Sequence, residues 1–248
     1  EDEVELLKSA DAAMYDAKRA GTGFSVFDTE ENTRRTNRLK LIADLDAAIN
    51  NNRLALHYQP IVDLKTNQVR GVEALCRWMH PERGFIPPDD FIALAEQKGL
   101  IQALTLWVLD TALAQCAAWH AQGLQIGMSV NLSTRNFLDP ELPSKVAGYL
   151  KKWQVPAQWL SLEITESMTM SDPARALEII RSLDVMGVKI SIDDFGTGYS
   201  SLAYLKKLQV DELKIDRSFV LELDKDHDNQ TIVRSTIDLA HSLGLMVV

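Results

Sequence analysis

Strand-like runs alternate with helical stretches along most of this 248-residue chain, and this alternation limits the folds it can adopt. The strand-like runs cover residues 54–63, 69–78, 125–133, 160–167, 188–195, 211–216 and 245–248. Helical patterns, such as 88–123 and 172–187, lie between most of them. Strands joined through helices predict parallel βα units. Because the strand count approaches eight in about 250 residues, a TIM-like (β/α)₈ barrel is favoured, with a doubly wound open sheet as the alternative.

The two ends of the sequence carry separate expectations. The run 245–248 is expected to be the seventh barrel strand, so an eighth strand is missing from the printed chain and we expect the native protein to continue. At the other end, a short helical pattern with a Lys-Arg end and a glycine stop precedes a charged segment. An amphipathic helix follows this segment. We therefore place a domain boundary near residue 30, with residues 1–30 separate from a domain over 31–248.

Bulk composition excludes some classes of protein. A net charge of -9 argues against a duplex nucleic-acid binder, which would need a basic face. The two isolated cysteines, Cys76 and Cys116, suggest neither a zinc site nor a disulfide framework. No apolar stretch reaches the ~20 residues of a membrane span and no secretory leader opens the chain. We expect a cytoplasmic protein without membrane contact in this chain, although upstream parts could tether it to a membrane.

Alternation within the strands separates an apolar face from a polar one. In the run 160–167, Leu162 and Ile164 share one face, while Ser161, Glu163 and Thr165 share the other. The apolar face would pack on the surrounding helices, which leaves the polar face toward the barrel axis. The same phase places these polar side chains on the axis side of other strands: Glu73, Asn131, Asp193, Lys214 and Asp216.

Acidic side chains inside a barrel need a shared counter-charge, because an unpaired buried carboxylate costs several kcal/mol. One lysine cannot neutralise three or four acids, so the pattern predicts a divalent cation with oxygen ligands, Mg²⁺ or Mn²⁺, with Ca²⁺ possible. Asp193 and Asp194 could flank two ions if the strand ends between them, since paired ions sit ~3.5–4 Å apart. Alternatively, each acid caps a helix or pairs with a nearby arginine.

Five motifs in order carry a family resemblance. "EAL" at Glu73 to Leu75 is followed by "NLS", "LEITE", "DDFGTGYSS" and "LKID". From about residue 38 to its end, the chain resembles the EAL-domain phosphodiesterases that hydrolyse cyclic di-GMP. The segment 10–28, "ADAAMYDAKRAGTGFSVFD", resembles the last helix and strand of a GGDEF diguanylate cyclase domain. It departs from the usual pattern at "GTG", and no GGDEF signature lies in this chain, so no cyclase activity is expected.

The resemblance implies a role for individual residues. Glu73, Asp193 and Lys214 would be catalytic, with Lys214 orienting or helping to deprotonate the attacking water. One metal ion would be held by Glu73, Asn131, Glu163 and Asp193, and a second would be served by Asp193 and Asp194. The substrate would be contacted by Gln59, Leu75 and Arg77. Glu166 would stabilise the loop that contains "DDFGTGYSS". Taken singly, Gln59 could instead be a polar residue at the rim and Leu75 a core leucine. Arg77 could form a surface ion pair, and Glu166 could be an acid at a helix start.

The implied activity is hydrolysis of cyclic di-GMP to linear pGpG, assisted by two Mg²⁺ or Mn²⁺ ions. A homodimer is also implied by the resemblance. One alternative is a non-catalytic cyclic di-GMP receptor, although such proteins typically lack some of the metal ligands that are all present here. A metal-dependent barrel enzyme of the enolase kind is a weaker alternative, because it gives the ordered motifs no role.

Overall fold

The computed structural model describes residues 29–196, 207–221 and 223–248, together with Leu205 and isolated positions among the first 26 residues; the side chains of residues 29–35 are not described. The chain divides into two compact units, residues 1–47 and 48–248. Nine of the nineteen residues in the segment 10–28, where a helix and a strand were expected, lie outside the described residues, as does the glycine-rich segment 197–204. The helix α2 (Thr29–Asn50) begins earlier than expected, so the charged segment before the amphipathic pattern is itself helical.

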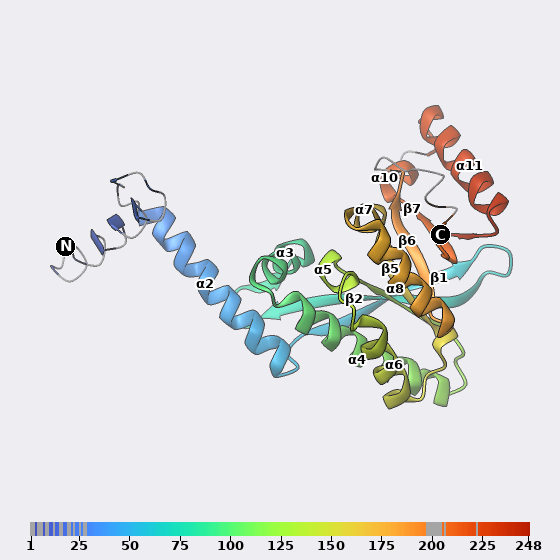
Figure 1. Cartoon of the computed structure of the whole chain (residues 1–248), viewed down its shortest axis with the longest axis horizontal. Helices are drawn as coiled ribbons and strands as arrows, with labels where there is room; N and C mark the ends of the chain where they lie inside the picture. The colour runs from blue at the N-terminus through green and yellow to red at the C-terminus, as the bar shows by residue number, and fades with distance from the viewer. Residues whose placement is uncertain are drawn as a thin grey trace. The chain divides into compact units, whose positions relative to one another are not determined.

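A curled, mostly parallel sheet forms the centre of the second unit (Figure 1). Its order is β1-β2-β4-β5-β6-β7-β8, and β3 pairs with β2. The strands are β1 (Ala55–Asp63), β2 (Gln68–His80), β3 (Gly84–Ile86), β4 (Gly127–Asn131), β5 (Leu160–Thr165), β6 (Lys189–Phe195), β7 (Glu212–Ile215) and β8 (Met246–Val247). All seven predicted strands are present, whereas β3 was not predicted.

The first strand departs from the parallel pattern, because β1 runs antiparallel to β2. A turn of four residues joins the two strands, which is too short for the crossover that a parallel pair requires. The Asp63 carboxylate accepts hydrogen bonds from the backbone N–H groups of Lys65 and Thr66, at 2.9 and 2.8 Å. Asn67 closes the turn with a positive φ of 56°. From β2 to β8, every neighbouring pair on the path is parallel.

Helices follow most of the parallel strands. They are α3 (Pro88–Lys98), α4 (Ile101–Ala121), α5 (Thr134–Phe137), α6 (Leu142–Trp153), the 3₁₀ helix η1 (Ala157–Trp159), α7 (Glu166–Ser171), α8 (Pro173–Val185), α10 (Arg217–Val220) and α11 (His227–Ser242). The pattern over 88–123 is two helices rather than one. Gly99 ends α3 with a φ of 77°, a left-handed conformation in which its N–H bonds back to the helix and redirects the chain.

The apolar helix α4 corrects one expectation. Among the described residues, it has the length and hydropathy of a membrane-spanning helix, although the sequence analysis found no such stretch. Eight of its residues, including Leu104, Leu109 and Leu113, are buried inside the domain. Packing in the core therefore accounts for its composition.

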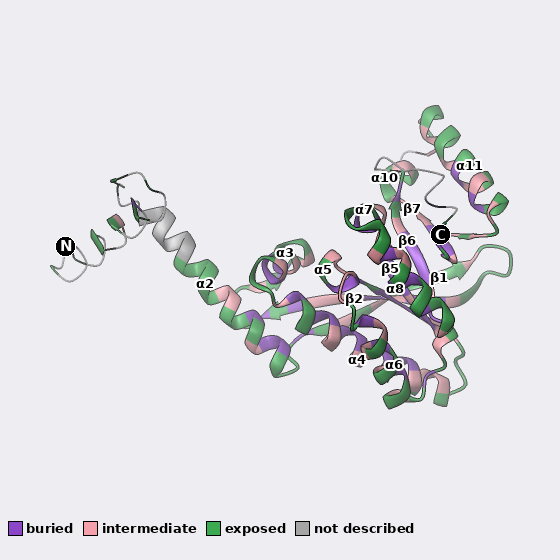
Figure 2. Cartoon of the chain, in the orientation of Figure 1, coloured by how far each residue is buried: buried purple, intermediate pink, exposed green. Residues whose placement is uncertain are grey.

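The predicted apolar phase of the strands forms the core (Figure 2). Leu162, Ile190 and Leu213, from three neighbouring strands, are fully buried. Their alternate neighbours carry the polar groups. At the carboxyl ends of β4 to β7 these polar groups face the same side of the sheet, which positions the site described next.

Candidate active site

The ammonium group of Lys214 on β7 lies among three carboxylates that come from three other strands. Its Nζ atom is 2.6 Å from Glu163 Oε2, 3.1 Å from Asp193 Oδ2 and 3.2 Å from Glu73 Oε2. We call these three acids the carboxylate cluster. The predicted polar phase therefore brings together residues that are 141 positions apart in the sequence.

Burial dominates the electrostatics of the cluster. Glu163 is 1% exposed, and this burial raises its pKa to about 8 despite the attraction of Lys214. Burial alone would lower the pKa of Lys214, but the charges of Glu163 and Asp193 outweigh it and raise the pKa of the ammonium. Lys214 is therefore a permanent cation at physiological pH, and Glu163 holds a proton more readily than an ordinary glutamate.

Asn131 and Gln59 both lie next to Glu73. The Asn131 side-chain amide, at the end of β4, donates a 2.7 Å hydrogen bond to Glu73 Oε1. Gln59 on β1 is directly opposite Glu73 in the antiparallel register, so the two side chains share a sheet face. The structure thus places one predicted metal ligand and one predicted substrate contact beside the cluster.

The two adjacent aspartates are separated by backbone geometry. We expected β6 to end between them, but the strand continues to Phe195. Instead, Asp194 adopts a positive φ of 53°, and the register with β7 is broken between Ile192 and Phe195. This local bulge re-aims Asp194 relative to Asp193, in the way that bulges next to functional sites commonly do. Both acids are therefore available at the same end of the sheet.

Asp216 joins the site although no role was predicted for it. It shares the polar phase of Lys214 and caps α10 by accepting a 2.9 Å hydrogen bond from the backbone N–H of Ser218. It is also hydrogen-bonded to Asp194. Burial, followed by the charges of Asp193 and Asp216, raises the pKa of Asp194. The "LKID" motif and its alternation were the signal that could have added Asp216 to the site.

The other predicted substrate residues continue the same face of β2. Leu75 and Arg77 are two and four positions beyond Glu73, and both are half-buried. The Arg77 guanidinium donates a 2.9 Å hydrogen bond to the carbonyl of Cys76. Their side chains therefore extend outward from the cluster along one strand.

Glu166 begins α7, directly after the end of β5. Its Oε2 atom is buried and has no hydrogen-bond partner among the described residues. The loop that Glu166 is predicted to stabilise covers 197–204, which lies outside them. Its predicted role stays a prediction.

The donor set fits a hard divalent cation. Glu163 Oε1 is buried and has no hydrogen-bond partner within the described part of the chain. Three carboxylates face a single ammonium, so negative charge is in excess, and carboxylate and amide oxygens are the ligands that Mg²⁺ and Mn²⁺ prefer. Among the described residues, however, no group of three His, Cys, Asp or Glu side chains has the spacing of a formed metal site. Lys214 lies between the acids that would form it.

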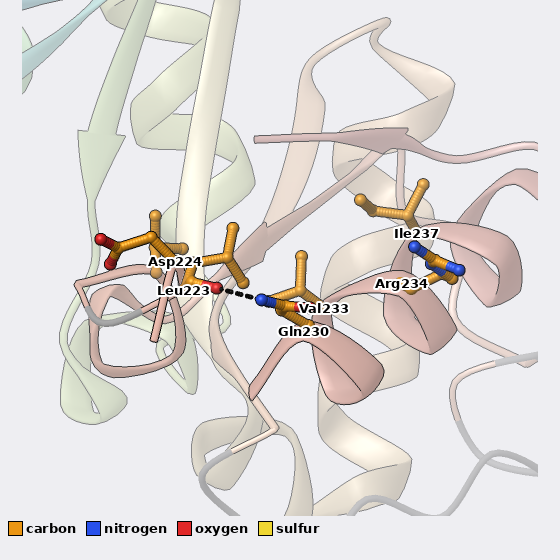
Figure 3. A pocket seen from close by; sticks show the side chains of 7 residues that line it. Leu223, Asp224, Gln230, Val233, Arg234 and Ile237 are labelled. Carbon is orange, nitrogen blue, oxygen red and sulfur yellow. Dashed lines mark hydrogen bonds between the residues drawn. The ribbon is translucent and has the colours of Figure 1, made fainter. Parts of the chain in front are cut away.

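Two hollows lie away from these residues. One, of about 630 Å³, lies between α10 and α11, where Gln230 donates a 2.8 Å hydrogen bond to the carbonyl of Leu223 (Figure 3). The other, of about 190 Å³, lies at the amino ends of the parallel strands, beside the ion pair of Arg70 and Glu212. None of the predicted site residues lines either hollow.

Comparison with known proteins identifies the fold. Residues 42–248 match the family model described as the EAL domain. The chain belongs to the EAL-domain family. The solved PaMucR phosphodiesterase in complex with c-di-GMP superposes with a TM-score of 0.80 at 44% identity, over 84% of this chain and 85% of that one. The EAL resemblance and the TIM-like barrel are therefore confirmed, and the doubly wound alternative is discarded.

Relatives with curated names agree with this family. The chain is 44% identical over 246 residues to MucR of Pseudomonas aeruginosa, a bifunctional diguanylate cyclase/cyclic di-GMP phosphodiesterase. It is 38% identical over 248 residues to PdeR of Escherichia coli, a cyclic di-GMP phosphodiesterase. These matches cover 98% and 100% of this EAL chain, but only 36% and 37% of the relatives. The chain thus spans about a third of their length, and the assignment of residues 1–30 to a GGDEF remnant stays a prediction.

Proposed function

We propose that this EAL domain hydrolyses cyclic di-GMP to linear pGpG, and that it needs a divalent cation, Mg²⁺ or Mn²⁺, to do so. The observation that carries the proposal is the carboxylate cluster around Lys214, at the carboxyl ends of barrel strands in a chain of this family. Catalytic residues of such barrels come from the ends of several strands. Named cyclic di-GMP phosphodiesterases among the relatives support the choice of substrate.

The residues of the chain supply binding, orientation and charge. Glu73, Glu163 and Asp193, with the amide of Asn131, would hold one ion, and Asp193 with Asp194 would serve a second. When bound, the ions would activate water and offset the charge that develops on the phosphoryl oxygens. We assign no step to a histidine, because the cluster contains none.

Lys214 and the strand β2 would handle the substrate. Lys214 would hold the attacking water by a hydrogen bond and keep it in line with the leaving 3′ oxygen, for which one of its three N–H donors has to leave the carboxylate that it contacts here. Gln59, Leu75 and Arg77 would contact the substrate, and the arginine suits a phosphate oxygen. The same proposal includes a homodimer, on the strength of the family resemblance, and a cytoplasmic location for this part of the protein.

The test is turnover of cyclic di-GMP by the purified protein with Mg²⁺, Mn²⁺ or Ca²⁺, followed by chromatography of pGpG. We expect turnover with Mg²⁺ or Mn²⁺, none in excess EDTA, and inhibition by Ca²⁺, whose looser geometry positions water poorly. Glu73→Gln should lower kcat at least about a hundredfold, as loss of a group that acts mainly in the transition state does. The control Glu178→Gln, at an exposed acid on α8, should not. Undiminished hydrolysis in EDTA would refute the metal requirement.

A non-catalytic receptor is the competing function. It would bind cyclic di-GMP with or without added metal and release no pGpG. The crystal structure of the Pseudomonas aeruginosa FimX EAL domain bound to c-di-GMP, 28% identical with a TM-score of 0.75, has the same fold. A c-di-GMP complex on this fold shows binding and not turnover, so the chromatographic assay is what separates the two functions.

A further inference from the structure

Two large apolar side chains lie side by side on the β2–β3 hairpin and remain exposed. Met79 is 66% exposed and Phe85 is 53% exposed. They are directly opposite each other in the antiparallel register, so their side chains stand on the same face of the hairpin. We call this pair the Met79–Phe85 platform. Single exposed apolar residues are ordinary, whereas adjacent ones often mark a binding surface.

The platform continues the face that carries the site. Along β2, exposure alternates: Val72, Ala74 and Trp78 are buried, whereas Arg77 and Met79 are not. Side chains two positions apart point to the same face, so the face that begins with Glu73 ends with Met79. The rise of a strand places the Cα atoms of Met79 and Arg77 about 7 Å apart, and those of Met79 and Glu73 about 20 Å apart.

The opposite face of the hairpin is fixed in the core. Trp78 is 1% exposed and packs edge-on against Phe91, with ring centroids 5.9 Å apart. His80 accepts hydrogen bonds at its Nδ1 atom from the backbone N–H groups of Glu82 and Arg83, at 3.1 and 3.2 Å. These contacts hold the turn between the two strands. The platform is thus presented by a well-supported element, so little ordering is needed when a ligand binds.

We propose that the Met79–Phe85 platform binds one purine base of the nucleotide substrate. The proposal rests on the proposed function and extends it to residues with no assigned role. A flat purine stacks well on an aromatic ring and on a polarizable thioether. Arg77 lies on the same face, one side-chain step closer to the cluster, where it suits a phosphate. A base on the ribose next to that phosphate would reach the platform, while the scissile phosphate stays at the carboxylate cluster.

The test separates base recognition from chemistry by using two substrates. Cyclic di-GMP carries purine bases, whereas bis(p-nitrophenyl) phosphate is a phosphodiester without one. Loss of one stacked base costs about 1–3 kcal/mol, so we expect Met79→Ser and Phe85→Ser together to raise the KM for cyclic di-GMP by about tenfold or more. The kcat for cyclic di-GMP and both constants for bis(p-nitrophenyl) phosphate should stay within about twofold. Phe85→Tyr should retain the wild-type KM, because the ring is kept.

A matched control is available on the other hairpin. Leu64, in the β1–β2 turn, is 96% exposed, and Leu64→Ser removes a comparable apolar side chain from the opposite end of β2. It should leave every constant unchanged. An unchanged KM in the double variant would overturn the platform, and so would an equal loss on both substrates, which indicates a structural role.

Calorimetric binding of cyclic di-GMP distinguishes failure of the platform from failure of the proposed activity. If the wild-type protein binds the dinucleotide without hydrolysing it, and the double variant binds it about tenfold more weakly, the result supports base binding by the platform and refutes the proposed hydrolysis. If the wild-type protein and the double variant hydrolyse it with the same KM, only base binding by the platform is refuted. Absence of any wild-type binding would overturn both.

Discussion

Replacing Lys214 by methionine should destabilise the metal-free protein, because it removes the cation from the carboxylate cluster and keeps the aliphatic stem. The Lys214 side chain is 12% exposed, and that of its nearest partner, Glu163, is 0% exposed. Breaking a buried ion pair by deleting one partner costs about 3–5 kcal/mol, since the remaining charge is left uncompensated. Solvent screens this cluster too little to remove the effect.

The expected value lies at the lower end of that range at neutral pH. Burial already raises the pKa of Glu163 to about 8, so without Lys214 this acid would hold a proton at pH 7 and avoid part of the penalty. The other two acids, Glu73 and Asp193, are 17% and 23% exposed and retain some hydration. We therefore expect a loss of about 3 kcal/mol, which for a chain of this size lowers Tm by about 6–12 °C.

The assay is thermal and urea unfolding of both proteins in excess EDTA, from pH 6 to pH 8.5. The loss should grow as pH rises, because Glu163, whose pKa is raised to about 8 and which has no counter-charge in the variant, then becomes ionised. Mg²⁺ or Mn²⁺ should stabilise the variant more than the wild-type protein, since the ion no longer competes with the ammonium for the same oxygens. The control is Lys152→Met, whose exposed pair with Asp110 should contribute less than about 1 kcal/mol. Equal stability of the Lys214 variant and wild type at pH 8.5 would refute the reasoning.

Three further predictions concern Glu163 and two acids outside the carboxylate cluster, Glu212 and Asp216. In EDTA, the raised pKa of Glu163 should make the free energy of unfolding fall as pH rises from 4.5 to about 8. The reason is that the folded state keeps a proton that the unfolded state has released. Glu163→Gln should remove most of this pH dependence in urea titrations. Glu212→Ala, which leaves the partly buried Arg70 without its partner, should cost about 2–4 kcal/mol of unfolding free energy while kcat stays unchanged. Asp216→Asn should keep Tm, because asparagine also caps a helix, yet lower the turnover measured as pGpG release, because it removes the charge that acts on Asp194.

The architecture and the cluster could be predicted because both depend on periodicity. Alternation along each strand separated the buried apolar side chains from the polar ones, and parallel strands bring their carboxyl ends to the same edge. Glu163 and Lys214, from different strands, accordingly lie 2.6 Å apart. Ordered motifs then supplied the family, which alternation alone cannot give.

Local backbone geometry could not be predicted by the same means. The bulge at Asp194 depends on a left-handed residue inside a strand, and aspartate gives only a weak signal for that conformation. The division of the 88–123 pattern at Gly99 was marked by glycine, but the helical periodicity continues across it. The three-residue strand β3 is too short to show any period, so the hairpin that carries Phe85 was missed.

Charge counting and charge placement lead to different conclusions about the cluster. Three acids against one lysine correctly predict an excess of negative charge that a divalent ion could offset. Counting does not show that Lys214 contacts all three acids, with every distance at or below 3.2 Å. A cation in that position both stabilises the folded chain and competes with an incoming ion for the same oxygens. The affinity of the site for metal should therefore depend on how far the lysine withdraws, so a Lys214→Met variant with unchanged Mn²⁺ affinity would show that the ion and the ammonium occupy separate places.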